Sequence, residues 1–409
     1  MARAGADAPP RRRRASASGA GGDDTACLRD GGGELQAQWD TLPDLVAVVD
    51  SGRPRRRKGA AAPLPQHDSR QQQQQQSVAP AADAESAAAE MAAGAPKRQP
   101  YRIGLTKEEA PAHVTYPYVM TGYRAGGTYA RCAAAALELH AETFNAWTMV
   151  WGSMLSLYLF AAALRSLSAA GALGGGGWWA AGRGGSGFWG GAPDWVPFAL
   201  LTGSTLAHAP WSVAFHLFRC MSPEVYNLWR RLDQVFIFQV SQFLTLGIAW
   251  FVYEARGPLL ANMAAAVLTA QVATRDIWGL PADFQRNRAH MVGFIACIVA
   301  CYFWPMGWQA ARDAAAWRAW AAAGAAGGAA AAPPLAAAGY AAGTLLSLGA
   351  GAAVFATGFP ERCFPRTFDV FGFSHQLMHW AAISAHAFEF AFVLEMWSRR
   401  RAEALGAVA

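Results

Sequence analysis

The stretch TFNAWTMVWGSMLSLYLFAAAL, residues Thr143–Leu164, holds no charged side chain and is bounded by Glu142 and Arg165. About 20 consecutive apolar residues cross the hydrocarbon core of a bilayer as one helix, so this stretch predicts a membrane span. A soluble helix of this length would carry charged side chains on its solvent face at a period of 3.6 residues, and no such pattern occurs here.

Six further stretches free of Asp, Glu, Lys and Arg follow, and together they predict an all-α membrane protein, a bundle of seven transmembrane helices. The fourth and sixth spans are rich in Ala and Gly, which favour insertion less than Leu or Phe. Tryptophans stand towards the ends of several spans, as in the aromatic belt of a bilayer. The six stretches are Trp195–Phe218, Gln234–Tyr253, Gly257–Thr274, Ala289–Ala311, Leu335–Ala356 and Val370–Phe388, the last continuing to Trp397.

The segments outside the spans differ from them in composition. Residues 1–98 combine arginine runs, a glutamine tract and many Ala, Gly and Pro residues. Such a segment cannot bury enough apolar surface to offset its chain entropy, and it predicts a disordered tail. We expect an amphipathic segment at 99–142, the transmembrane domain at 143–397 and a short C-terminal tail at 398–409. A Gly/Trp-rich linker around Gly174–Gly191 predicts a flexible loop.

The charged residues bear on partners and on orientation. The arginine runs of the tail can contact anionic lipid or nucleic acid, but a solvated basic tail is the simpler interpretation, so we expect membrane lipid and no nucleic acid as a partner. The acid-poor start of the chain is also similar in composition to an organelle transit peptide. Basic residues divide evenly between the two sides of the membrane. Arg124, Arg131 and the tail favour a cytoplasmic N-terminus in the plasma membrane or an endomembrane, whereas Arg399–Arg401 oppose it.

Four ionisable side chains lie at the ends of different spans. With seven spans, the end of the second, the start of the third and the start of the seventh lie on one side of the membrane, whichever way the chain is oriented. His216, Asp233 and the pair His375/His379 occupy those ends. Polar groups at membrane depth are expensive and need partners, so their coincidence predicts a functional site.

The histidines have the spacing of metal ligands. His375 and His379 are four residues apart, so they stack on one helix face with Cβ atoms about 5–6 Å apart. His216 can approach from a neighbouring helix as the third nitrogen, leaving the fourth tetrahedral position open for water, as in catalytic zinc sites. An HxxxH pair alone more often links helices by hydrogen bonds. The third histidine and Asp233 make the metal interpretation about as strong as that alternative.

Polar side chains extend from these positions into the bundle. Ser212 lies one turn before His216 and belongs to a stripe, at steps of four, that should face the interior. On the last span His386 and Glu389 continue the face of His375. We therefore expect a polar channel that leads to the site. Taken singly, Asp233 could instead pair with a neighbouring arginine, and Glu142 could be a first-turn residue favoured by the helix dipole. The stripe consists of Ser204, His208, Ser212 and His216.

Five motifs in the expected order resemble those of the progestin and adipoQ receptor (PAQR) family, which includes haemolysin III-like proteins. They cover about Pro117–Trp397, the whole membrane domain. Phe215–Ser222 with Leu232-Asp233 resembles the family's S-x3-HLFxCHS…LD block, Ser374–His379 its SHQxxH, Pro117–Arg124 its PYxxxGYR, Glu142–Thr148 its ETxNxWTH, and Pro360–Asp369 its PER…FD.

This resemblance implies a seven-helix protein with Zn²⁺ held near the cytoplasmic face by His216, His375 and His379. It also implies that Asp233 hydrogen-bonds the water at the zinc and that Ser212 lines the site. Members are described as receptors for adiponectin-type or steroid ligands, and some as zinc-dependent lipid amidases of ceramidase type.

The chain departs from the family pattern at five positions. They put the subfamily, the ligand and the access of water in question, and none is an implied zinc ligand. Met149, Met221 and Phe373 stand where His is common, Gln234 stands where Tyr is common, and Glu389 stands where His is frequent.

Three functions remain open at this point. The first is a zinc-dependent hydrolase of a ceramide-like lipid amide, with Asp233 as general base and Ser212 as a donor to the oxyanion. The second is a receptor for a lipid, steroid or protein ligand, in which zinc only ties two spans together and nothing is turned over. The third is a channel or transporter along the polar stripe, for which the repeated halves and broken helices of transporters are missing.

Overall fold

The computed structural model describes residues 99–173, 192–279, 284–323 and 333–406. All of them belong to one compact unit, Ala95–Ala409. The expected tail at 1–98 and the expected loop around Gly174–Gly191 lie outside the described residues.

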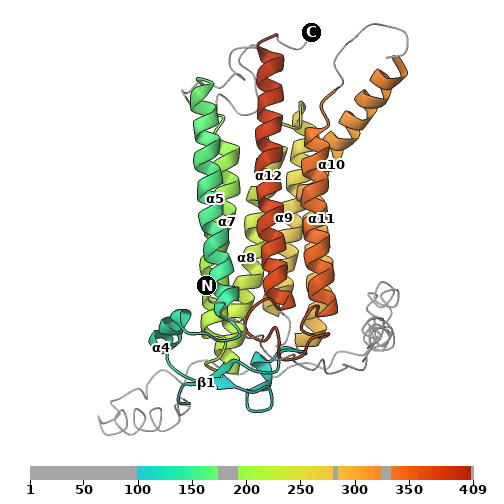
Figure 1. The fold of residues 1–409 in the computed structure, drawn as a ribbon. Coiled ribbons are helices and arrows are strands. Elements are labelled where there is room, and N and C mark those ends of the chain that lie inside the picture. Colours follow the sequence, from blue (N-terminus) through green and yellow to red (C-terminus); the bar gives the residue numbers. More distant parts are fainter. Residues whose placement is uncertain (1–98, 174–191, 280–283, 324–332, 407–409) are drawn as a thin grey trace, which may run out of the picture. The chain divides into compact units, whose positions relative to one another are not determined.

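Seven long helices form the body of the described chain (Figure 1), which confirms the predicted fold class. Six of them are long and apolar enough to cross a membrane. The other is α7, in which His208, His216 and several hydroxyl side chains lower the mean hydropathy. The helices are α5 (Thr143–Ala169), α7 (Val196–Phe218), α8 (Pro223–Ala249), α9 (Arg256–Gly279), α10 (Phe284–Ala323), α11 (Ala336–Thr357) and α12 (Ser374–Ala404).

The helices pack in chain order, and the last one returns to the first. Each helix from α5 to α12 contacts its successor, and α12 also packs against α5 and α7. This closure brings the start of α12 beside the start of α5 and the end of α7. An apolar cluster that includes Leu167, Phe198, Met306 and Trp397 fills the opposite end of the bundle.

Several helix boundaries differ from the charge-free stretches, and α10 for example runs from Phe284 to Ala323 rather than from Ala289 to Ala311. Helix α8 begins at Pro223 rather than Gln234, because Ser222 caps it by accepting a hydrogen bond from the Val225 N–H at 3.3 Å and proline fits the first helical position. The expectation that Asp233 starts its helix was therefore wrong, since it lies almost three turns inside α8. Helix α12 begins at Ser374, later than Val370, and runs on to Ala404. Charges delimit the apolar part of a helix, not its ends.

Residues 99–142, expected to be amphipathic, form a small folded cap on the bundle. An antiparallel pair of strands, β1 (Arg102–Leu105) and β2 (Tyr123–Ala125), is followed by the short helix α4 (Tyr129–Ala134). The 3-10 turns η1 (Ala112–Val114) and η2 (Ala135–Leu137) complete it. Buried Val119 and Tyr123 pack in one cluster with Phe373, which precedes α12. The cap is thus attached to the end of the bundle at which α12 begins.

Candidate metal centre

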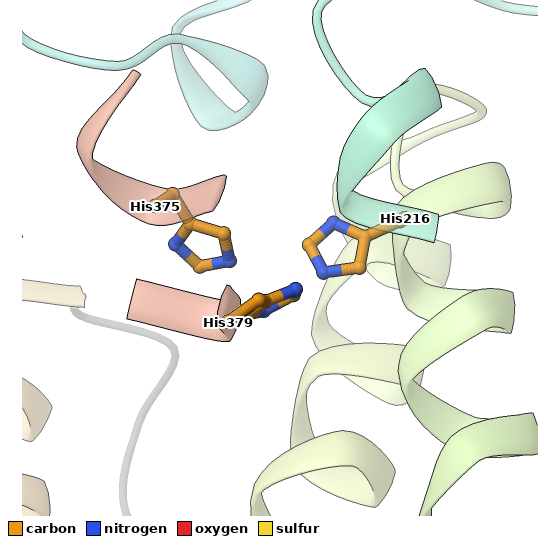
Figure 2. Close-up of side chains that lie close together, drawn as sticks. All are labelled: His216, His375 and His379. Carbon is orange, nitrogen blue, oxygen red and sulfur yellow. The ribbon is translucent and has the colours of Figure 1, made fainter. Parts of the chain in front are cut away.

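Three histidines from two helices meet inside the bundle. His216 ends α7, and His375 and His379 lie in the first turns of α12 (Figure 2). One ligand nitrogen of each lies within 4.8 Å of the others. The ring centroids are 4.8 Å apart for His375–His379, 5.3 Å for His216–His375 and 5.4 Å for His216–His379. The three side chains predicted from spacing are therefore brought together, and they could hold a metal ion.

His216 is oriented by an acidic side chain from the first span. Its Nδ1 lies 2.7 Å from Oε2 of Glu142, so the imidazole donates its Nδ1–H to the carboxylate. The other nitrogen, Nε2, is buried and has no hydrogen-bond partner among the described residues. Metal-binding histidines commonly donate one ring N–H to a carboxylate in this way, which fixes the tautomer and leaves the second lone pair for the metal.

His379 is oriented by a hydroxyl group on α5. The Thr148 hydroxyl donates to the Asn145 carbonyl oxygen at 2.8 Å, so it can only accept from Nδ1 of His379 at 2.7 Å. The lone pair of His379 then lies on Nε2. On His375, Nδ1 is buried and has no hydrogen-bond partner among the described residues. The rings of Tyr116 and Phe355 pack against the imidazole ring, with centroid distances of 5.8 and 5.4 Å.

The donor set fits a metal with nitrogen ligands. A tetrahedral zinc ion with Zn–N bonds of about 2.0–2.1 Å needs ligand nitrogens about 3.3 Å apart. The longest separation here is 4.8 Å, so small ring rotations would be needed to close the set. Without a metal, the buried nitrogens of His216 and His375 would destabilise the fold, because each loses its hydrogen bonds to water and forms no hydrogen bond within the described residues.

Glu142 is the centre of a buried charge network that sequence reasoning did not predict. Its Oε1 pairs with Arg219 at 2.7 Å, and its Oε2 also accepts from Asn145 at 2.7 Å. Burial alone would raise the pKa of Glu142, but Arg219, His216 and Asn145 outweigh it and hold that pKa well below its usual value. An acid just before span one, with an arginine three residues after His216, was the available signal.

Asp233 has a partner that was not predicted, and Ser212 lies next to it. The carboxylate lies 3.1 Å from Nε2 of His208, one of the stripe residues on α7. The Ser212 hydroxyl is a second polar neighbour of the same carboxylate. Arg230 instead donates to Gln234 at 3.4 Å. Asp233 is also within electrostatic reach of His379 and His216.

Deeper in the bundle, His386 and Glu389 of the polar face predicted on α12 take part in a further group of hydrogen bonds. Nε2 of His386 lies 3.0 Å from both the Ser156 and the Thr205 hydroxyl, and its Nδ1 lies 2.9 Å from Glu389. These bonds link α5, α7 and α12. The polar interior therefore extends beyond the histidine cluster, although α7 contributes Thr205 here rather than a residue of the predicted stripe.

Comparison with known proteins places the chain in a family. Residues 137–390 match the profile of the family described as Haemolysin-III related. No curated protein matches the chain. Because the profile covers more than half of the sequence, and its residues include α5 to the first half of α12, the chain belongs to the Haemolysin-III related family, the PAQR/HlyIII family of multi-pass integral membrane proteins.

Proposed function

We propose that His216, His375 and His379 bind a zinc ion and that the centre hydrolyses a lipid amide of ceramide type. The buried, unpartnered nitrogens of His216 and His375 carry the metal assignment. Three neutral imidazoles suit zinc among the divalent metals, and three protein ligands are the number found in catalytic zinc sites. A membrane lipid is the expected substrate class because the histidines lie within apolar helices.

The residues around the histidines supply the other parts of a hydrolytic site. A bound zinc ion acts as a Lewis acid that polarises an amide carbonyl and acidifies water. Asp233 accepts the proton of the attacking water as general base, and His208 holds the carboxylate from its other side at 3.1 Å. Ser212 can donate a hydrogen bond to the oxyanion that develops on the carbonyl oxygen.

The experiment measures zinc content and lipid-amide hydrolysis on one preparation. The Asp233→Asn variant should keep its zinc and lose activity by ~10²–10⁴-fold, the usual effect of removing a general base. The matched control is Asp194→Asn, which alters a buried carboxylate hydrogen-bonded to Trp397 at the other end of the bundle. That variant should keep both zinc and activity.

Two results would count against the proposal. Full turnover by zinc-replete Asp233→Asn protein would show that Asp233 is not the general base. No turnover by the zinc-loaded parent would favour a receptor in which the ion only ties α7 to α12.

A further inference from the structure

Two buried arginines flank a small cavity between the cap and the end of α7. Arg124 of β2 is 3% exposed and Arg219 is 4% exposed. The cavity has about 10 Å³ of room for the centre of a water-sized sphere, which corresponds to a single water or an ion of similar size. It is lined by Val114, Gly122, Tyr123, Arg124, Ala141, Glu142, Arg219 and Cys220.

Three nitrogens of these two arginines have no hydrogen-bond acceptor among the described residues. Arg124 uses Nη2 to donate to the carbonyl oxygens of His216 and Leu217, at 2.9 and 3.2 Å. Its Nε and Nη1 are buried without a partner in the described chain, and so is Nε of Arg219. Unpaired buried donors are rare in native proteins, and each calls for a bound water or ion.

The charges around the cavity do not balance. Glu142 is the one carboxylate in the lining, and its two oxygens are already engaged by Arg219, His216 and Asn145. Arg124 forms no salt bridge with any acidic residue that the structure describes. A buried guanidinium without a counter-charge is strongly unfavourable in a low-dielectric interior.

The thiol of Cys220 does not supply the missing negative charge. Its Sγ lies 3.8 Å from the carbonyl oxygens of Gly126 and Leu217, which are acceptors for an S–H donor and would repel a thiolate. Its Sγ also lies 3.6 Å from the Sγ of Cys132, and this contact together with Arg124 lowers the pKa of the Cys220 thiol to about 7. The thiol is therefore only partly ionised at neutral pH and gives Arg124 no permanent counter-charge.

We propose that this cavity binds one chloride ion between the guanidinium groups of Arg124 and Arg219. The volume admits a monatomic ion and excludes phosphate, sulfate or a carboxylate. Chloride accepts from several N–H donors at once and neutralises the charge left by Arg124. Because Arg124 also holds the carbonyl oxygen of His216, the ion stabilises the end of α7 that carries the first histidine.

The test is the thermal unfolding of the full-length protein in lipid nanodiscs, with chloride or gluconate as the anion at constant ionic strength. At about 100 times its Kd, a single-site ligand should raise the melting temperature by roughly 5 °C. Bromide should replace chloride, and sulfate should not. In crystals soaked in bromide, the anomalous signal should show one peak between Arg124 and Arg219.

A matched pair of variants tests the charge argument at Val114, a buried wall residue of the cavity. Val114→Asp supplies a fixed carboxylate of nearly the same shape, so its melting temperature should no longer depend on chloride. Val114→Asn is neutral and should keep the dependence. The proposal is overturned if the parent melts at one temperature in both anions and bromide gives no peak, which would leave a water in the cavity. The bromide measurement on the parent decides the matter if Val114→Asp does not fold.

Discussion

Replacing Glu142 by Gln should weaken binding of the proposed zinc ion, although Glu142 is not itself one of the proposed ligands. Oε2 of Glu142 accepts from His216 and Asn145, and Oε1 accepts from Arg219. A glutamine keeps one acceptor oxygen, but its NH₂ group must face either Arg219 or the pair His216 and Asn145, all of which are donors. If the NH₂ group faces His216, the imidazole must turn its Nδ1 into an acceptor and carry its proton on Nε2. The lone pair needed for the metal is then lost.

The size of this effect follows from the contacts that are broken. Loss of an outer partner of a metal ligand typically costs 10–100-fold in affinity, or about 1.4–2.7 kcal/mol. Folding stability should fall as well, because Arg219 is left buried with no carboxylate, and breaking such a pair typically costs about 3–5 kcal/mol. Glu142 and Arg219 are 8% and 5% exposed, so little solvent screening reduces this cost.

The assay is competition for zinc with a chelator of known affinity, together with thermal unfolding of the same sample. Glu138→Gln is the matched control, since Glu138 lies in the same segment but pairs with Arg131 at the surface. It should bind zinc like the parent. Folded Glu142→Gln protein with zinc affinity within a factor of two of the parent would refute the orienting role.

Three further predictions concern single contacts. The His375→Ala/His379→Ala double variant should lose its zinc, measured by elemental analysis, and stoichiometric zinc in it would end the assignment. Thr148→Val removes the acceptor of the His379 Nδ1–H and should weaken zinc affinity about tenfold in the chelator assay, whereas Thr148→Ser should not. His140 is buried, and that burial lowers its pKa to about 3 from an unfolded value near 6.5. The free energy of unfolding is therefore at its full value above about pH 6.5 and decreases as the pH falls towards 3. At pH 5 the decrease is about 2 kcal/mol. Denaturant unfolding from pH 7 to 5 should show this slope, and His140→Gln should reduce it by about that amount, leaving the part due to other histidines whose pKa burial lowers, such as His113.

The sequence was sufficient for the number of long helices and for the three histidines. Charge-free length identifies a span without any knowledge of packing, and the parity of the spans then assigns His216, His375 and His379 to one end of the bundle. Both inferences use only distances along the chain. In the structure α12 packs against α5 and α7, and this packing brings the histidines at that end of the bundle together.

The partners of the site residues could not be predicted in the same way. Glu142–His216 and Asp233–His208 depend on rotation of each helix about its axis, which sequence spacing between helices does not determine. The start of α8 was missed for a different reason, because the charge of Asp233 bounds the apolar stretch Gln234–Tyr253 whereas the helix extends back through it to Pro223. The strand pair in residues 99–142 was also not foreseen, because its strands are only four and three residues long.

The return of α12 to α5 has a consequence for biogenesis. During synthesis the Glu142–Arg219–His216 network can form once α5 and α7 have left the ribosome, but His375 and His379 are made more than 150 residues after His216. The ribosome and the insertion machinery therefore handle a chain with one ligand in place and two not yet made. If the three histidines bind the proposed zinc ion, the complete set of ligands exists only after the last helix has inserted beside the first. A chain that stops before α12 has one of the three histidines, so occupancy of the proposed site would report that translation and membrane assembly are complete.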